Sequence, residues 1–252
     1  MTHLTELEQF LAATLRVASI TDYAPNGVQV RGRESVNKVV GGVSACLDLF
    51  QAAQDAAADL ILVHHGLLWN KDSRVVEGIF QTRLKFLLMR DLTLMAYHLP
   101  LDCHPELGNN SLILKHLNLN PTASFGLYHG TWLSFVGECD APEPFDVFLS
   151  RVIHLFGGEP LVLPFGPAMV KKIAVCSGAA PELIREAKQV GADVFLSGEA
   201  SEPLYHFARE EGIHFIAAGH HRTEKFGVQA VGELLARQYG LEFMFIDIPN
   251  PI

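Results

Sequence analysis

The sequence predicts an α/β protein of two related lobes, in which mostly parallel sheets are covered by helices. Two observations predict this fold. Short apolar runs alternate with amphipathic segments of helical length, a pattern typical of parallel strands joined by helices. In addition, residues 38–66 align without a gap with residues 172–200, and seven of the 29 pairs are identical. Because the order of elements is also the same in both segments, we interpret the chain as an internal duplication.

Each half is expected to supply the same series of elements. A helix and a short strand come first, and strand, helix, strand, helix and strand follow. In the first half the expected segments include a helix over 4–16, strands over 27–30 and 60–63, a helix over 76–90 and a strand over 92–97. In the second half they include a strand over 131–137, a helix over 144–156, strands over 160–165 and 194–196, helices over 203–211 and 224–237, and a strand over 214–218.

The join between the halves falls near residues 121–124, so we place one lobe at 1–122 and the other at 123–252. The two lobes are expected to pack as one functional unit. A (β/α)₈ barrel also fits a chain of 252 residues, but the twofold repeat disfavours it. Generic periodicity of strands and helices is the alternative explanation of the repeat.

Composition excludes several classes of protein. The formal charge of −9 disfavours nucleic acid as a partner, because an acidic surface repels phosphates. No apolar run reaches the roughly 18 residues that a membrane span needs. The N-terminal segment lacks the cationic start of a signal peptide, so we expect a cytoplasmic protein. Four cysteines without a C-x-x-C pair exclude a zinc ribbon, whereas 12 histidines point to imidazole chemistry.

Three clusters of metal-ligating side chains stand where apolar runs end. Because ligands bind at the carboxyl ends of strands in α/β sheets, these positions favour a common site. The clusters are His64-His65, His98 with Asp102, and His220 with Glu224. A histidine pair that is only hydrogen-bonded is the plainer explanation of any one cluster. The repetition of the clusters at similar positions favours metal binding.

Imidazoles and carboxylates without thiolates suit catalytic Zn²⁺, Mn²⁺, Fe²⁺ or Ni²⁺. Three histidines and two carboxylates exceed the needs of one ion with an open position, so we predict two divalent metal ions per chain. Glu199 occupies the repeat position of His65 and is a candidate for positioning a ligand or accepting a proton. His98 and His221 are further candidates for proton relay, and the role of His104 stays open.

At VHHG, YHLPLDCHPELGNN, SGEASE and AAGHHRTEKFGVQAVGELL the sequence resembles the GTP cyclohydrolase 1 type 2 homologues, the Nif-three-like dinuclear metal centre proteins. The resemblance covers essentially the whole chain and is greatest to short bacterial members. It implies two similar α/β lobes assembled into a toroidal hexamer with metal sites facing an internal cavity. Many relatives have Tyr where this chain has His221.

The resemblance also implies a ligand set. One ion would be held by His65, Asp102 and Glu224, and the other by His64, His220 and Glu224, so that Glu224 bridges the two ions. Type I GTP cyclohydrolases use a zinc held by cysteine and histidine, and this chain has no matching arrangement. We therefore rank GTP cyclohydrolase activity below that of a general hydrolase.

The leading hypothesis is a metal-dependent hydrolase in which two ions activate water against a small polar or nucleotide-like substrate. The alternative is a non-enzymatic ring that serves as a metal-binding adaptor, storage protein or chaperone. A ring that threads nucleic acid is a third possibility, which the acidic charge disfavours.

Overall fold

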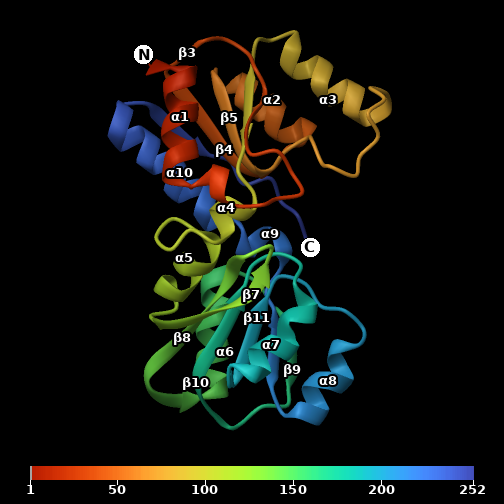
Figure 1. The fold of residues 1–252 in the computed structure, drawn as a ribbon, viewed down its shortest axis with the longest axis vertical. Helices are drawn as coiled ribbons and strands as arrows, with labels where there is room; N and C mark the ends of the chain where they lie inside the picture. The colour runs from red at the N-terminus through yellow and green to blue at the C-terminus, as the bar shows by residue number, and fades with distance from the viewer. Residues whose placement is uncertain (1) are drawn as a thin grey trace. The chain divides into compact units, whose positions relative to one another are not determined.

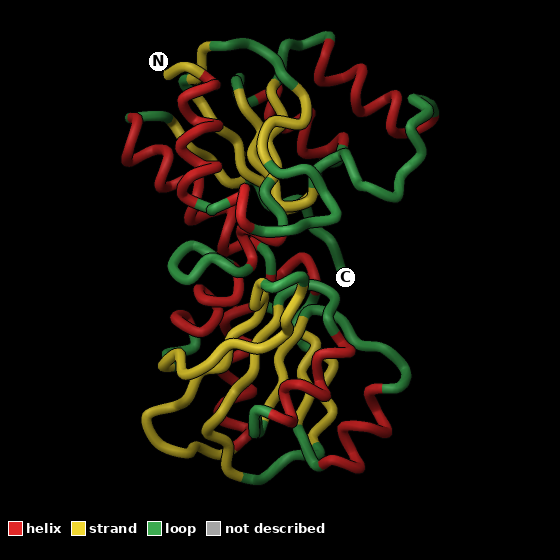
Figure 2. The backbone as a smooth tube through the Cα atoms, viewed as in Figure 1, coloured by secondary structure: helices red, strands yellow, loops and turns green. Residues whose placement is uncertain are grey.

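The computed structural model describes residues 2–252, which divide into two compact units. The first unit comprises the chain up to Leu101 together with Gly227–Pro249, and the second comprises Asp102–Phe226 with Asn250–Ile252. Each unit has a sheet flanked by helices (Figure 2). The predicted α/β fold is therefore confirmed.

The first unit contains most of the N-terminal elements and the last strand. Its helices are α1 (Leu4–Thr14), the 3₁₀ turn η1 (Val17–Ser19), α2 (Leu47–Asp55), α3 (Gly78–Leu88), most of α4 (Leu99–Asp102) and most of α10 (Lys225–Tyr239). Its strands are β1 (Thr2–His3), β2 (Gly27–Val30), β3 (Ser35–Val36), β4 (Lys38–Ser44), β5 (Leu60–His65), β6 (Thr93–Ala96) and β13 (Glu242–Phe245).

The sheet of the first unit has the order β13-β4-β5-β6-β2. The first four strands are parallel, and β2 pairs antiparallel with β6. Side chains alternate between the faces, so Val40, Ile61 and Val63 join one buried cluster with Leu49 of α2 and Leu87 of α3. Figure 1 shows α2 and α3 on one side of these strands and α1 and α10 on the other. Helices therefore cover both faces, as a buried parallel sheet requires.

The second unit contains the remaining elements. Its helices are α5 (Asn109–His116), α6 (Phe145–Phe156), the 3₁₀ turn η2 (Pro181–Leu183), α7 (Ile184–Gln189), α8 (Leu204–Glu211) and α9 (His220–Thr223). Its strands are β7 (Asn120–Tyr128), β8 (Thr131–Pro144), β9 (Leu161–Pro164), β10 (Met169–Cys176), β11 (Val194–Ser197) and β12 (His214–Ala217).

The sheet of the second unit has the order β7-β8-β10-β11-β12-β9. Strands β10, β11 and β12 are parallel, and the outer strands pair antiparallel with their neighbours. Alternate side chains enter two different cores. Val175 and Leu196 pack with α5 and α6, whereas Ala174 and Phe195 pack with α7 and α8. The central strands are therefore apolar on both faces.

The predicted repeat is present in the topology of the two sheets. The order β4-β5-β6-β2 in the first unit matches β10-β11-β12-β9 in the second, with the same parallel and antiparallel pairings. In each case the last strand of the row follows the first helix of its half, α1 before β2 and α6 before β9. This agreement confirms that the lobes are related.

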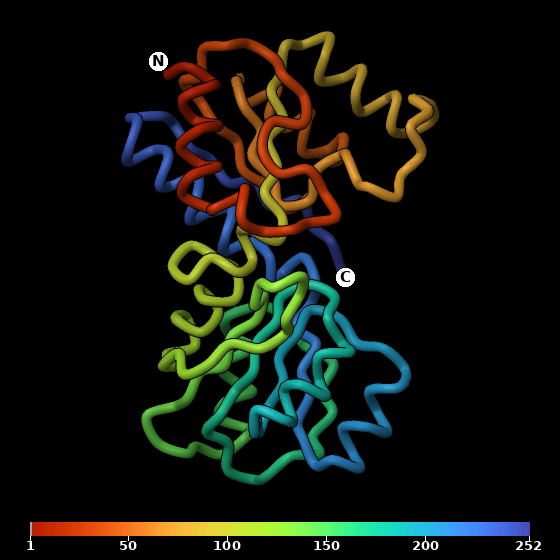
Figure 3. Tube along the Cα trace, viewed as in Figure 1, coloured from red at the N-terminus to blue at the C-terminus, as the bar shows by residue number. Residues whose placement is uncertain are grey.

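The compact units differ in their limits from the predicted lobes at 1–122 and 123–252. Strand β13 pairs with β4, and Phe10 of α1 contacts Tyr239 of α10 at a ring-centroid distance of 5.4 Å. Residues Gly227–Pro249, within the blue part of Figure 3, thus lie in the same unit as the red N-terminal helix. Within residues 2–252, no helix is long and apolar enough to cross a membrane.

Candidate metal centre

Several of the predicted metal ligands and proton-relay candidates lie where strands end in each unit. In the first unit β5 ends with His64 and His65, and His98 follows shortly after β6. In the second unit Glu199 follows β11, and His220 begins α9 just after β12. Strands β5 and β6 are parallel neighbours, as are β11 and β12, so each pair ends at a common edge.

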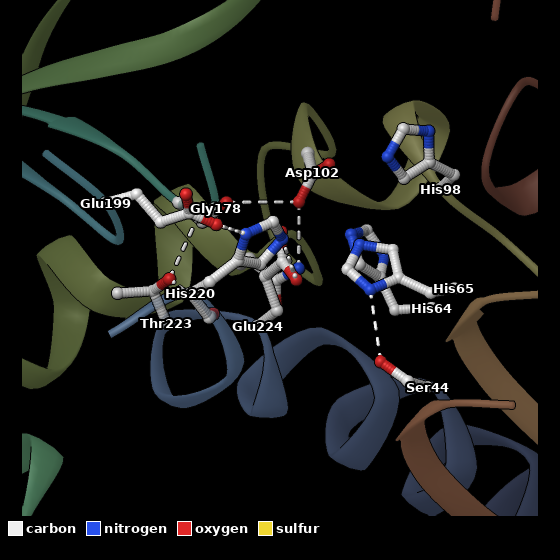
Figure 4. Close-up of polar contacts among 12 residues, drawn as sticks. Ser44, His64, His65, His98, Asp102, Gly178, Glu199, His220, Thr223 and Glu224 are labelled. Atoms are coloured by element: carbon white, nitrogen blue, oxygen red, sulfur yellow. Dashed lines mark hydrogen bonds and ion pairs between the residues drawn. The ribbon is translucent and has the colours of Figure 1, made fainter. Parts of the chain in front are cut away.

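His64 and His65 are each oriented through one ring nitrogen. Figure 4 shows the contact between His65 and Ser44. His64 is fully buried, and its Nδ1 lies 2.9 Å from the carbonyl oxygen of Tyr97. A carbonyl oxygen only accepts, so Nδ1 carries the proton of the neutral ring and Nε2 carries the lone pair. The Nδ1 of His65 lies 3.2 Å from Ser44 Oγ on neighbouring β4. Such contacts set the rotation of a ligand ring before any ion arrives.

His98 packs against both of these rings. Its ring centroid lies 5.1 Å from that of His64 and 5.6 Å from that of His65. One ligand nitrogen from each of the three histidines lies within 4.8 Å of the others. The first unit alone therefore gathers three imidazoles at a spacing that suits one ion.

Asp22 holds His98 from behind. Its Oδ1 lies 2.9 Å from His98 Nδ1 and also accepts the Ala24 N–H, while Oδ2 accepts from Asn26 Nδ2 and Leu99 N. Burial raises the pKa of the Asp22 carboxyl, but the hydrogen bond and charge of His98 and the other donors lower it further, so the net pKa is below its ordinary value. An ionised Asp22 thus keeps a proton on the Nδ1 of His98.

Asp102 is fixed by donors from two elements of the second unit. Asn109 Nδ2 lies 2.8 Å from Asp102 Oδ1, and Ser177 Oγ lies 3.1 Å from the same oxygen. Asn110 ties these donors together, because its Oδ1 accepts the Ser177 N–H at 2.7 Å and its Nδ2 donates to Leu133 O at 2.8 Å. These contacts hold one carboxylate oxygen of Asp102 and thereby orient the other.

His220 lies between two carboxylates. Its Nδ1 is 2.5 Å from Glu199 Oε1, and its Nε2 is 3.1 Å from Glu224 Oε2. Burial lowers the pKa of His220, but the hydrogen bonds and charges of Glu224 and Glu199 outweigh it and raise the pKa to about 9. The same negative charge that stabilises an imidazolium attracts a metal cation. Glu199 therefore contacts the Nδ1 of His220, and whether it also accepts a proton stays a prediction.

The turn after β10 forms a cradle for Glu224. Gly178 has a φ of +66°, and a Cβ at this position would lie 2.3 Å from Glu224 Oε1 and 3.2 Å from His220 Nε2. The Gly178 N–H donates to Thr223 Oγ1 at 3.0 Å. Only glycine combines this backbone conformation with the close approach, so residue 178 defines where the Glu224 carboxylate lies.

The donor set fits a divalent metal. Imidazole nitrogens and carboxylate oxygens are the ligands of Zn²⁺, Mn²⁺, Fe²⁺ and Ni²⁺ sites, and His64, His65, Asp102 and His220 are each held through a second polar atom by a protein group. Hydrogen bonding through the atom that does not ligate the metal is characteristic of metal ligands. The His, Asp and Glu groups therefore suit a metal-binding protein.

Two other histidines near the clusters are placed differently. His221 is buried in α9, next to His220, and its backbone N–H donates to Ile252 O at 3.0 Å. His104 turns its Nδ1 toward the chain and accepts the backbone N–H groups of Glu106 and Leu107 at 3.2 Å and 3.0 Å. His104 therefore stabilises the turn before α5, and proton relay by His221 stays a prediction.

Sequence reasoning missed the residues that orient the ligands. Asn109 and Asn110 belong to the ELGNN segment that carries part of the family resemblance, so a signal for them existed. Ser177 stands out in the sequence only as part of a turn before a helix. Asp22 gave no signal, because it lies 76 positions before His98 in a segment without a recognisable motif.

The chain matches known proteins over its full length. The Duf34/NIF3 (NGG1p interacting factor 3) family matches residues 2–251. A Pseudomonas aeruginosa protein called "GTP cyclohydrolase 1 type 2 homolog" is 43% identical over 99% of this chain and 97% of its own length. A protein described as "protein ybgI, unknown function" is 42% identical with a TM-score of 0.95, and TTHA1606 from Thermus thermophilus is 32% identical with a TM-score of 0.88; both comparisons cover 100% of each chain. The chain therefore belongs to the Duf34/NIF3 family.

Proposed function

We propose that this protein is a binuclear metal-dependent hydrolase that acts on a small polar or nucleotide-like molecule. One observation carries the proposal. Four of the five predicted ligands have one polar atom held by another protein group, which orients the second polar atom: His64, His65, Asp102 and His220. Glu224, the fifth, lies against the glycine cradle. This arrangement is what tight metal coordination requires.

The proposed ligands are those that the family resemblance implies. His65, Asp102 and Glu224 would hold one ion, and His64, His220 and Glu224 would hold the other, with Glu224 as the bridge. The ions would be Zn²⁺, Mn²⁺, Fe²⁺ or Ni²⁺, and when bound they would activate a water molecule and polarise the bond that breaks. The protein's own contribution is to hold the ligating nitrogen and oxygen atoms in fixed orientations close to the ions.

Proton transfer is proposed for residues beside the ligands. His98 is the leading candidate, because Asp22 holds its Nδ1–H and so directs Nε2 away from that carboxylate. Tyr23 Oη lies 3.5 Å from this Nε2. Glu199 and His221 are the other candidates, although Glu199 already holds His220 Nδ1.

Substitution of Glu224 by Gln tests the mechanism. The change keeps the volume but removes the bridging charge, so we expect loss of bound metal and of turnover. Purified wild-type and variant proteins would be analysed for metal content and then assayed with phosphoesters, cyclic amides and GTP. Glu233→Gln is the matched control, because Glu233 is exposed on α10 and forms an ion pair with Arg237 of the same helix. Turnover that persists unchanged in Glu224→Gln would contradict the proposal.

The non-enzymatic alternative gives a different result in the same experiment. An adaptor, storage protein or chaperone would bind exchangeable metal and show no turnover with any substrate of the panel.

We also propose a cytoplasmic homo-oligomer, a hexamer by resemblance to the family. Native mass spectrometry of the isolated protein would test the hexamer and count the ions per chain in one measurement.

A further inference from the structure

A cavity of about 760 Å³ lies in the first unit, next to the group formed by His64, His65 and His98. Its volume is within the range of small-molecule sites. It is an open pocket lined by the segment that joins β5 to α3 and by the first two turns of α3, which Figure 1 shows at the outer side of this unit. The cavity begins at Gly66, the residue that follows His65. Its residues are not among the metal ligands.

The wall of the cavity is aromatic and apolar. Trp69 and Phe80 contribute rings, and Val75, Val76 and Ile79 line the cavity although their side chains are largely exposed to solvent. Apolar side chains that stay exposed around a hollow are characteristic of ligand sites rather than of a finished core. A planar apolar ring system bound in the cavity would cover these side chains.

Two cations line the cavity, Arg74 and Arg83, and among residues 2–252 neither forms an ion pair. Arg83 of α3 lines the cavity, and its Nε is buried without a hydrogen-bond partner. Asp72 and Glu77 also line the cavity, yet among residues 2–252 neither forms an ion pair with Arg83. A buried guanidinium donor without an acceptor costs free energy, which an anionic ligand would recover.

Trp69 connects the cavity to the histidines. Its ring centroid lies 5.8 Å from that of His65 and 5.3 Å from that of His98, and Tyr23 stacks on it at 5.9 Å. The backbone of Asp72 donates to Trp69 O at 3.1 Å and closes the turn that positions this ring. A molecule held in the cavity would therefore reach from Arg83 to the edge of the metal-binding histidines.

We propose that this cavity binds a planar aromatic or heterocyclic organic anion. Trp69 and Phe80 take the ring, and Arg83 takes a carboxylate or phosphate-type group. That the anion is the substrate of the metal centre rests on the proposed function, whereas binding in the cavity does not require it.

Calorimetric titration of the purified full-length protein tests the proposal with three probes that share one ring. 2-Naphthoate carries a carboxylate, 2-naphthylphosphonate carries a phosphate-like group that cannot be hydrolysed at an ester bond, and 2-naphthamide is neutral. We expect saturable binding of at least one anion. Arg83→Gln should weaken that anion about tenfold or more and leave 2-naphthamide unchanged. Trp69→Leu should weaken all bound probes about fivefold.

Arg237→Gln is the matched control, because Arg237 belongs to the same unit but is exposed on α10 outside the cavity. Circular dichroism and thermal melting would establish that each variant is folded, and Arg83→Met, which also removes the charge, replaces Arg83→Gln if the latter is not. Absence of saturable anion binding, or equal weakening by Arg83→Gln and Arg237→Gln, would overturn the proposal.

Metal content measured on the same samples separates the two proposals. Anion binding that depends on Arg83 in protein without metal would support the cavity and count against the binuclear centre. Two ions per chain without anion binding would support the binuclear centre and contradict the cavity proposal.

Discussion

Asp59 and Asp193 perform the same structural task in the two units. Asp59 Oδ2 accepts the backbone N–H groups of Asn37 and Lys38 at 2.9 Å and 3.1 Å, and Asp193 Oδ2 accepts those of Lys171 and Lys172 at 2.8 Å and 2.9 Å. Asp59 directly precedes β5 and holds the start of the neighbouring β4, and Asp193 directly precedes β11 and holds the backbone of the neighbouring β10. All three pairs are separated by the same 134 positions that define the sequence repeat. The duplication therefore extends to individual hydrogen bonds.

This equivalence predicts matched losses of stability. Asp59→Ala and Asp193→Ala each leave two backbone donors without their carboxylate acceptor, so each should lower the free energy of unfolding by about 2 kcal/mol. Urea denaturation of the metal-free protein would measure both. Asp55→Ala is the control, because Asp55 is exposed and its carboxylate accepts from Gln51 on the surface of α2. A loss below about 0.5 kcal/mol in either repeat variant would contradict the prediction.

Gly178→Ala should reduce metal binding by more than its loss of folding stability explains. The new Cβ would meet Glu224 Oε1, and the left-handed backbone adds strain of about 1–2 kcal/mol. Gly191→Ala carries the same kind of strain at φ +77°, but nothing lies within 4 Å of its Cβ. Elemental analysis should therefore show reduced metal only in Gly178→Ala, while thermal melting shows destabilisation in both. Equal metal content in the two variants would exclude a role of the cradle.

Asn109→Ala should weaken metal binding through Asp102. The substitution removes the donor at 2.8 Å from Asp102 Oδ1, and loss of such a partner typically costs 10–100-fold in metal affinity, on the order of 1–3 kcal/mol. Competition titration with a chromophoric chelator would measure this affinity. Asn120→Ala removes an exposed amide that donates to Asp140 and serves as the control. Affinity within a factor of about two of wild type would show that Asn109 does not position Asp102.

His214 should make the metal-free protein less stable in mild acid. Burial lowers the pKa of His214 below its ordinary value, although hydrogen bonding to Pro167 O and the charges of Asp193 and Asp146 oppose this. Its Nδ1 accepts the Gly166 N–H at 3.2 Å, so protonation would break that bond. Since the unfolded chain takes up this proton first, stability should fall as the pH drops below about 6.5.

His214→Phe would test this pH dependence, because Phe keeps an aromatic ring against Phe145, which stacks on His214 at 3.6 Å. The variant should be less stable at neutral pH but should lose less stability, by about 1 kcal/mol, between pH 7 and pH 5. His154→Gln changes an exposed residue of α6, so the free energy of unfolding should depend on pH as it does in the wild type. If His214→Phe and the wild type lost the same free energy of unfolding between pH 7 and pH 5, groups other than His214 would cause the acid sensitivity.

Much of the fold and of the candidate site could be predicted from the sequence. Strand and helix periodicity is local, so most elements were expected within a few residues of where they lie. The pairing of β13 with β4 was not expected, because a strand pattern does not say which distant strand it joins. For the same reason the predicted limits at 122 and 123 differ from those of the compact units.

By itself, the sequence determined the α/β class, the duplication and the identity of the ligand types at strand ends, because these follow from periodicity, repeat spacing and residue chemistry. Only the tertiary structure decided how those ligands are oriented. Asp22 reaches His98 and Ser177 reaches Asp102 across 76 and 75 positions of the chain. Such hydrogen bonds depend on how distant segments pack, and no local pattern encodes that packing.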